Sequence, residues 1–206
     1  MTAQYGFYID VDRCTACKTC IAACKDKNDT FVGLKYRRVI DCEGGSWTQS
    51  EGVQVPDGVF VYSVSYSCNH CAMPACLAAC PTNAISKRDD GIVVIDKDNC
   101  IGCGSCKAAC PYDTPRLNTE AQVMGKCDFC VDRLERGENP ACVDACLMRC
   151  IEHGELADLQ AKYGSQADLE PLASSGTTTP SLVIGLPRTN PGNAPVRVVS
   201  PPEELL

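Results

Sequence analysis

The apolar residues of this chain fall in short runs, which predict short strands and helices joined by polar connections. Residues 4–11 alternate between apolar and polar positions and predict a strand. The runs at 91–96 and 181–185 predict two more short strands. Between 156 and 163, apolar side chains recur at helical spacing just before Gly164, which predicts one short amphipathic helix.

Residues 34–67 have the pattern of inserted β-structure. One alternating strand pattern opens this stretch, and another closes it at 59–66. Turns are expected at Gly44–Gly45 and at Pro56–Gly58, because glycine and proline interrupt strands. We expect Trp47, the single tryptophan of the sequence, to have a packing role.

The C-terminal stretch is poor in core-forming pattern. After Gly164 it turns to serine and threonine and then to proline, with five prolines from Pro187 onwards. Such a composition predicts a tail that is disordered or lies along a partner.

Cysteine changes this picture, because the 206 residues include 18 cysteines in short, regular groups. The third group runs from Cys100 to Cys110 as C-x2-C-x2-C-x3-C-P, the run by which bacterial ferredoxins bind iron–sulfur clusters. A cysteine at every third residue lets a short loop place its sulfurs around one cubane. The fourth cysteine follows one helical turn later and can reach a second cluster. The four groups in sequence order are Cys14, Cys17, Cys20 and Cys24; Cys68, Cys71, Cys76 and Cys80; Cys100, Cys103, Cys106 and Cys110; and Cys127, Cys130, Cys142 and Cys146.

An internal repeat links the first and third groups. Residues 9–24 and 95–110 align at a constant offset of 86, the separation of Cys14 and Cys100, through all cysteines of both groups. Three of the groups end in Cys-x-Ala-Ala-Cys, and small alanines suit a helical turn pressed between two bulky clusters. Helix propensity alone does not account for this repetition.

Zinc is the rival metal for the fourth group, which is spread out with eleven residues between Cys130 and Cys142. A C-x2-C pair with a distant second pair also occurs in structural zinc sites. Beside three cubane-type groups, iron–sulfur is the better interpretation. Cys42 and Cys150 are left over, and each is expected to be a small buried residue. Cys150 lies four residues after Cys146 and competes with it, although the other groups end at the first C-x3-C.

Composition and charge exclude several classes of function. The N-terminus lacks the pattern of a signal peptide, so a secreted disulfide scaffold is not expected. The net charge of −7, with a further charge of about −8 from four thiolate-bound clusters, disfavours nucleic-acid binding. No apolar run approaches the ~20 residues of a membrane helix, so any membrane attachment is expected to go through partners.

Motifs for catalysis are not found in this sequence. It contains no Gly-rich dinucleotide loop, no phosphate-binding loop, and no second histidine close to His70 in sequence for a metal triad. His70 is expected to lie near a cluster or at the surface rather than to bind metal. A row of clusters carries single electrons, so we predict an electron-transfer protein rather than an enzyme. The rival from another class is a zinc-bound interaction module.

The order of the four groups and the length of the sequence resemble the four-cluster, ferredoxin-type iron–sulfur subunits of membrane-bound molybdopterin oxidoreductases, in particular the B subunits of anaerobic dimethyl sulfoxide reductases. The resemblance covers about residues 4–154, including 5–7, 44–47, 67–71 and 100–103. Related nitrate reductase subunits have tryptophan at the position of Cys103 and a three-iron cluster there, so cysteine at this position implies four irons. The family usually has proline after the last cysteine of the fourth group, where this sequence has Leu147.

The resemblance also implies how the clusters are held. Groups one and four would pair, and groups two and three would pair, each giving its last cysteine to the partner's cluster. The implied [4Fe-4S] ligand sets are Cys14, Cys17, Cys20 and Cys146; Cys127, Cys130, Cys142 and Cys24; Cys68, Cys71, Cys76 and Cys110; and Cys100, Cys103, Cys106 and Cys80.

The implied fold class is α+β, with two ferredoxin-like modules, a β insertion and an extended C-terminal tail. The implied domains are residues 1–30 plus 120–154 for one module, 31–67 for the insertion, 68–119 for the second module, and 155–206 for a short helix and a Pro-rich tail. Because metal binding then supplies folding energy, we expect the iron-free protein to be largely unfolded.

The function implied by the resemblance is anaerobic respiratory electron transport. The protein would relay electrons between a quinol-oxidising membrane anchor and a molybdopterin catalytic subunit, with dimethyl sulfoxide reductase as the expected complex. Formate dehydrogenase, thiosulfate or polysulfide reductase, and hydrogenase are alternatives of the same kind. The expected location is peripheral to the membrane. Co-export with a twin-Arg partner favours the periplasmic face over the cytoplasmic one.

Overall fold

The computed structural model describes residues 3–190 and 194–201. The helices are α1 (Thr19–Lys27), α2 (Ala75–Ala78), α3 (Ser105–Ala109), α4 (Val131–Leu134), α5 (Ala141–Asp144), α6 (Leu156–Tyr163) and the 3-10 helix η1 (Ser175–Thr177). The strands are β1 (Tyr5–Asp10), β2 (Arg38–Ser50), β3 (Val53–Tyr66), β4 (Ile85–Lys87), β5 (Val93–Ile95), β6 (Arg116–Asn118), β7 (Val123–Gly125), β8 (Ile151–Glu155), β9 (Leu182–Gly185) and β10 (Arg197–Val198). The three strands and the amphipathic helix expected from the apolar pattern are confirmed as β1, β5, β9 and α6.

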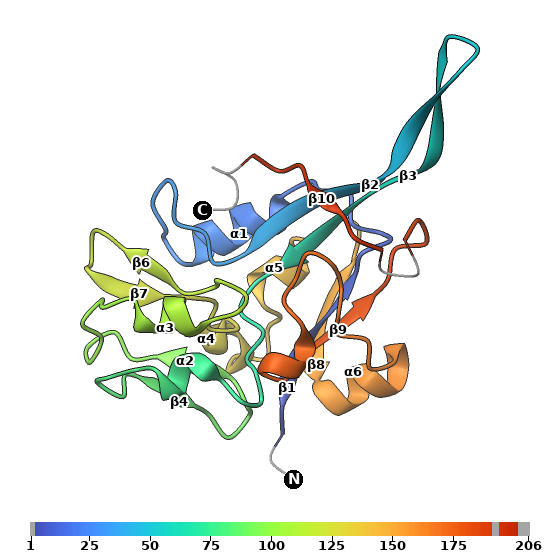
Figure 1. Cartoon of the computed structure of the whole chain (residues 1–206). Helices are drawn as coiled ribbons and strands as arrows, with labels where there is room; N and C mark the ends of the chain where they lie inside the picture. Colours follow the sequence, from blue (N-terminus) through green and yellow to red (C-terminus); the bar gives the residue numbers. More distant parts are fainter. Residues whose placement is uncertain (1–2, 191–193, 202–206) are drawn as a thin grey trace.

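Strand β1 is the middle strand of the sheet β8-β1-β9, which lies beside α6 in Figure 1. It runs antiparallel to β8 and parallel to β9. Both of its faces are covered. Phe7 stacks on Phe129 in the main core with ring centres 4.1 Å apart, and Tyr8 stacks on Tyr163 of α6 at 3.6 Å. A strand covered on both faces needs apolar residues at consecutive positions, which explains the burial of Phe7, Tyr8 and Ile9.

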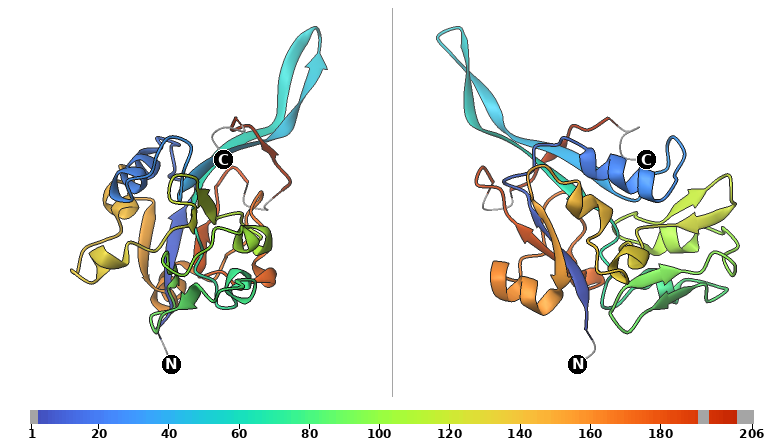
Figure 2. Two further views of the ribbon diagram at one scale, coloured as in Figure 1. Left: turned by 90° about the vertical axis from the view of Figure 1, so that its left-hand side faces the viewer. Right: turned by 180° about the vertical axis from the view of Figure 1, so that it is seen from behind.

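Two pairs of short helices are in contact, α1 with α5 and α2 with α3. Figure 2 shows the hairpins β4–β5 and β6–β7 on one side of the molecule and the sheet around β1 on the other. The internal repeat is visible in the backbone, because Ala16 and Lys18 have the same left-handed conformation as Gly102 and Gly104, 86 positions later. The equivalent loops therefore curl in the same way before α1 and α3.

The insertion forms one long hairpin, and the two expected turns within it are wrong. Strands β2 and β3 pair along most of their length and reverse at Glu51–Gly52. Gly44–Gly45 and Pro56–Gly58 lie opposite each other inside the strands, where the register shifts. Gly45 and Gly58 have positive φ, so the glycines accommodate a β-bulge instead of ending the strands.

The outer part of this hairpin, residues 45–59, is hereafter called the arm. All of its residues are exposed, and it projects from the body of the molecule (Figure 1). Trp47 lies in the arm and is 61% exposed. The expected packing role for Trp47 is therefore wrong. Trp47 does belong to a strand, but it lies in the part of β2 that extends beyond the core.

The prediction of a disordered or partner-bound tail is wrong for the described residues. Strand β9 pairs with β1, and β10 pairs with β2. Leu169, Val183 and Ile184 are buried in the body of the molecule. The tail completes two sheets by edge pairing, which needs few apolar residues and leaves a weak sequence pattern. In the described part of the molecule, every helix is too short or too polar to cross a bilayer.

Candidate metal centres

Cysteines of two different groups meet at each of two small hollows. The first lies between the α2 and α3 segments. Its cysteines are Cys80, Cys100, Cys103 and Cys106, and its apolar walls include Ile85, Ile95 and Met124. It thus brings together three cysteines of the third group and the last of the second.

The second hollow is lined by cysteines of the first and fourth groups. Cys14, Cys17 and Cys20 share it with both Cys146 and Cys150. The Sγ atoms of Cys146 and Cys150 are 3.4 Å apart, and the backbone N–H of Cys150 also donates to Cys146 Sγ. Cys150 is buried, as expected, but it belongs to the wall of this hollow. Cys146 and Cys150 therefore compete for the place of the fourth ligand in the fold as well as in the sequence.

A third set lies where α1 meets the fourth group. Cys24 is buried in α1, and burial raises the pKa of its thiol to about 12, with further contributions from the negative charges of Cys142 and Cys130. Burial also raises the pKa of Cys127, and the charge of Cys24 adds to that effect. The contact between α1, which holds Cys24, and α5, which holds Cys142, agrees with these electrostatic contributions.

The fourth set combines the second and third groups. Burial raises the pKa of Cys76 to about 12, and the charges of Cys68, Cys110 and Cys71 raise it further. Burial likewise raises the pKa of Cys71 to about 11. The two hollows each join the cysteines of one implied set, and the pKa effects agree with the other two sets. Their role as cluster ligands stays a prediction.

Hydroxyl groups surround the sulfurs at hydrogen-bonding distance. A metal-bound thiolate only accepts, so each hydroxyl would then be the donor. Such hydrogen bonds help to set the reduction potential of an iron–sulfur cluster. The sulfur-to-oxygen pairs are Cys17 with Thr19 (3.4 Å), Cys20 with Ser65 (3.3 Å), Cys71 with Thr178 (3.2 Å), Cys80 with Thr82 (3.7 Å), Cys103 with Ser105 (3.3 Å) and Cys110 with Thr114 (3.5 Å).

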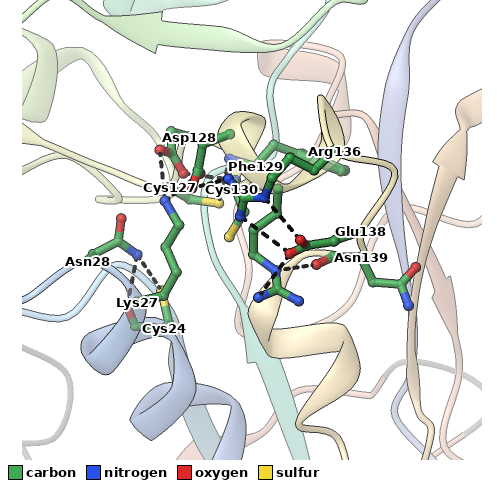
Figure 3. A network of polar contacts seen from close by, with 12 residues as sticks. Cys24, Lys27, Asn28, Cys127, Asp128, Phe129, Cys130, Arg136, Glu138 and Asn139 are labelled. Carbon is green, nitrogen blue, oxygen red and sulfur yellow. Dashed lines mark hydrogen bonds and ion pairs between the residues drawn. The ribbon is translucent and has the colours of Figure 1, made fainter.

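Polar contacts fasten the first group to the fourth (Figure 3). Lys27 at the end of α1 forms ion pairs with Asp132 at 2.6 Å and Asp128 at 3.9 Å. Asn28 donates to the carbonyl oxygen and the sulfur of Cys24. The charged side chain of Lys27 therefore holds two distant segments together.

His70 lies inside the molecule rather than at the surface. It is 1% exposed, and its Nδ1 accepts a hydrogen bond from the backbone N–H of Val93. Burial and the charge of Lys126 lower the pKa of His70 well below its ordinary value, so the ring is neutral. Cys42 is fully buried, as expected, on β2.

The donor sets fit iron–sulfur clusters. Around a single zinc ion, four sulfurs sit about 2.3 Å from the metal and leave no hollow between them. Here, no three cysteines of the described residues are placed to hold one metal ion, although cysteines of two groups line each hollow, and this wider spacing suits a cluster better than a single zinc ion. Thiolates are the usual ligands of [4Fe-4S] clusters. Because burial raises the pKa of several of these thiols, cluster assembly at neutral pH must displace protons from them.

Sequence reasoning missed the residues that border the sulfurs from outside the cysteine groups. Arg37, Ser65 and Thr178 are all buried, and none of them lies within a cysteine group that would mark it. One weak signal was available, because Arg37 and Arg38 interrupt an otherwise apolar strand pattern. Such an interruption in a core strand indicates a buried charge with a role.

Paired ferredoxin-like cysteine groups around buried hollows define an iron–sulfur protein. Family models agree with this class: residues 59–156 match a 4Fe-4S dicluster domain, and residues 11–30 match a 4Fe-4S binding domain. The protein belongs to the family of iron–sulfur subunits, or B subunits, of anaerobic dimethyl sulfoxide reductases.

The similarity to this family extends over most of the sequence. The B subunit of the anaerobic dimethyl sulfoxide reductase of Escherichia coli (strain K12) is 46% identical, and the alignment covers 89% of each sequence. The B subunit of the Haemophilus influenzae reductase is 45% identical over 88% of each sequence. The iron–sulfur subunit of the nitrate-inducible formate dehydrogenase of Escherichia coli is 40% identical over 74% of this sequence and 54% of its own length.

Proposed function

We propose that this protein is the electron-transfer subunit of a dimethyl sulfoxide reductase-like complex in anaerobic respiration. Its four [4Fe-4S] clusters would relay electrons between a quinol-oxidising membrane anchor and a molybdopterin catalytic subunit, which reduces the substrate. The single observation that carries this proposal is that cysteines of two different groups meet at each of two hollows, as cross-ligated clusters require. The names of the relatives support the choice of complex.

The proposed ligands are the sixteen cysteines of the four groups, with each group giving its last cysteine to its partner's cluster. The lining of the two hollows and the mutual electrostatic effects of the other eight cysteines support this assignment. Where Cys146 and Cys150 compete, we assign Cys146. It closely follows α5, just as Cys80 and Cys110 follow α2 and α3.

The proposed domains are two ferredoxin-like modules. One comprises residues 1–30 and 120–154, and the other comprises residues 68–119. Residues 31–67 form the insertion and residues 155–206 the C-terminal segment. The contacts of α1 with α5 and of α2 with α3 support this division.

The four clusters would form one continuous path. Cys20 and Cys24 lie one turn apart on α1 and would join the first cluster to the second. The second and third sets would be neighbours, which the effect of the Cys68 charge on the pKa of Cys127 supports. Cys76 lies in α2 and Cys80 just after it, and they would join the third to the fourth.

Electrons would enter and leave at the two ends of this path. Cys17 in the first set and Cys103 in the fourth are exposed, whereas the cysteines of the second set are buried. The end clusters would therefore come close to redox groups of partner subunits. We place the complex at the membrane surface, with the periplasmic face favoured by co-export of the folded protein with a signal-bearing partner.

Metal analysis of anaerobically isolated protein tests the proposal. About sixteen irons and as many sulfides per polypeptide are expected, together with the brown colour of cubane clusters. Far fewer irons, or zinc in their place, would overturn it.

Single substitutions test the cross-ligation. Cys146→Ser is expected to change the paramagnetic resonance signal of the same cluster as Cys17→Ser. Cys127→Ser is expected to change the same cluster as Cys24→Ser. Cys150→Ser serves as the control and should load iron like the unaltered protein. If Cys146→Ser and Cys127→Ser change the same cluster, the proposed pairing is wrong.

A further inference from the structure

Arg37 is the largest fully buried side chain of the described residues, with 1% exposure. It lies just before β2. Its guanidinium group donates to the hydroxyls of Ser65 and Ser67, both at 3.1 Å, and its central carbon lies 4.9 Å from the centre of the Phe7 ring. Among the described residues, no carboxylate forms an ion pair with it. A buried cation is costly unless negative charge lies nearby.

The side chains near Arg37 that can carry negative charge are cysteines, which become thiolates when they bind metal. Burial opposes the charged form of the guanidinium, but the sulfurs of Cys142, Cys20, Cys127 and Cys24 outweigh burial and raise its pKa above the ordinary value. These four cysteines belong to the first and second of the proposed ligand sets. The geometry agrees, because the Phe7 ring under Arg37 stacks on Phe129, whose backbone N–H donates to Cys127 Sγ at 3.4 Å. Arg37 therefore lies near ligands of both proposed clusters of the module made from groups one and four.

A series of hydrogen bonds also connects Arg37 to one of these sulfurs. Arg37 Nη1 donates to Ser65 Oγ, which lies 3.3 Å from Cys20 Sγ. If that sulfur binds iron, the Ser65 hydroxyl donates to it while accepting from the guanidinium. Polarisation along this series would strengthen the hydrogen bond to the sulfur.

We propose that Arg37 is a fixed positive charge that raises the reduction potentials of the two clusters held by groups one and four. This inference rests on the proposed function. A cubane with four thiolates carries about −2 when oxidised and about −3 when reduced, and net charge is one of the factors that set its potential. A nearby buried cation stabilises the more negative form. One electron enters the cluster, no bond is formed or broken, and the guanidinium keeps its proton throughout.

The second module has a buried cation beside it, Lys126, which donates to the carbonyl oxygens of Val93 and Cys127. Arg38, the neighbour of Arg37 in sequence, contacts the segment after the third group instead. It donates to the carbonyl oxygens of Tyr112 and Asp113 and pairs with the Asp113 carboxylate at 3.7 Å. A carboxylate partner offsets the field of Arg38. Arg37 is therefore expected to affect one pair of clusters selectively.

Redox titration of iron-loaded protein, followed by paramagnetic resonance, tests this role. The ligand variants described above assign the signals to clusters. Arg37→Gln is expected to lower the ratio of reduced to oxidised cluster at least tenfold at a fixed potential, about 59 mV for one electron. This shift should appear only in the clusters of groups one and four. Arg37→Lys keeps the charge and should leave the ratio within about threefold.

Arg88→Gln is the matched control, because it removes the same charge from an ion pair at the surface with Asp90 and Glu135. It should leave all four potentials unchanged. If Arg37→Gln fails to load iron, Arg37→Lys decides: unchanged potentials support the charge role, and lowered potentials contradict it. Normal iron content with unshifted potentials in Arg37→Gln would overturn this inference alone. An unaltered protein without iron would overturn the proposed function instead.

Discussion

At the scale of single residues, exposure divides the cysteines into two kinds. Cys103 lies at the surface, and the pKa of its thiol is lowered by hydrogen bonds from the hydroxyl and the backbone N–H of Ser105. Cys127 is buried, and its pKa is raised by that burial. Exposed ligands at the end clusters suit electron exchange with partner subunits. Buried ligands protect the middle clusters of the electron path from solvent.

Cys103 offers the sharpest test at this scale. Cys103→Ser or Cys103→Trp leaves three good ligands for its cluster, so loss of one iron and formation of a three-iron cluster are expected. The oxidised variant should show a new three-iron resonance signal, and transfer through that cluster should fall at least tenfold. Cys42→Ser, at a buried cysteine outside the four sets, should leave the spectrum unchanged. An unchanged spectrum in the Cys103 variants would refute the assignment.

At the scale of secondary structure elements, the arm is the part least tied to the rest of the molecule. Trp47 is the only tryptophan, so its fluorescence reports on the arm alone. In the isolated subunit, an uncharged quencher such as acrylamide should reach Trp47 nearly as well as it reaches free indole. Strong protection from quenching in the monomeric protein would contradict the exposed position of the arm.

Strand β9 makes the C-terminal segment part of the core. Ile184 is 2% exposed in β9, and replacing it by alanine should lower the free energy of unfolding by about 2–5 kcal/mol. Val199→Ala, at an exposed position of the same segment, should change it by no more than about 0.5 kcal/mol. Thermal unfolding of the two iron-loaded variants gives the comparison. Equal melting temperatures would mean that β9 does not pack as described.

At the scale of the whole molecule, cross-ligation ties stability to metal. Each proposed cluster of the module made from groups one and four takes ligands from both ends of the 14–146 segment, so neither end can close its site alone. Removing iron with a chelator under oxidising conditions should abolish most of the near-ultraviolet circular dichroism and the cooperative melting transition. Apoprotein that still melts cooperatively would contradict this dependence.

The net charge of the whole molecule becomes more negative when clusters are bound. The polypeptide carries −7 before any cofactor is counted, and four clusters add further negative charge in either redox state. Buried cations such as Arg37 and Lys126 offset part of that charge where clusters would be held. The distribution of these cations, rather than the net charge, is expected to decide the differences between the clusters.

The sequence by itself determined the candidate ligands and the local strands. Ligand spacing is a local property, because a loop with a cysteine at every third residue already has the shape to surround a cluster. The repeat at an offset of 86 reflects the same backbone in two loops, as Lys18 and Gly104 illustrate. Strands β1 and β5 and helix α6 were predictable for the same reason, since their apolar patterns span only a few residues.

Only the tertiary structure decided what depends on contacts between distant residues. The bulge at Gly45 and Gly58 forms because two strands pair across it, so neither glycine could be distinguished from a turn in isolation. The C-terminal segment is ordered by hydrogen bonds to β1 and β2, which its own composition does not reveal. The position of Arg37 near cysteines from α1 and from two places in the fourth group likewise follows from folding alone.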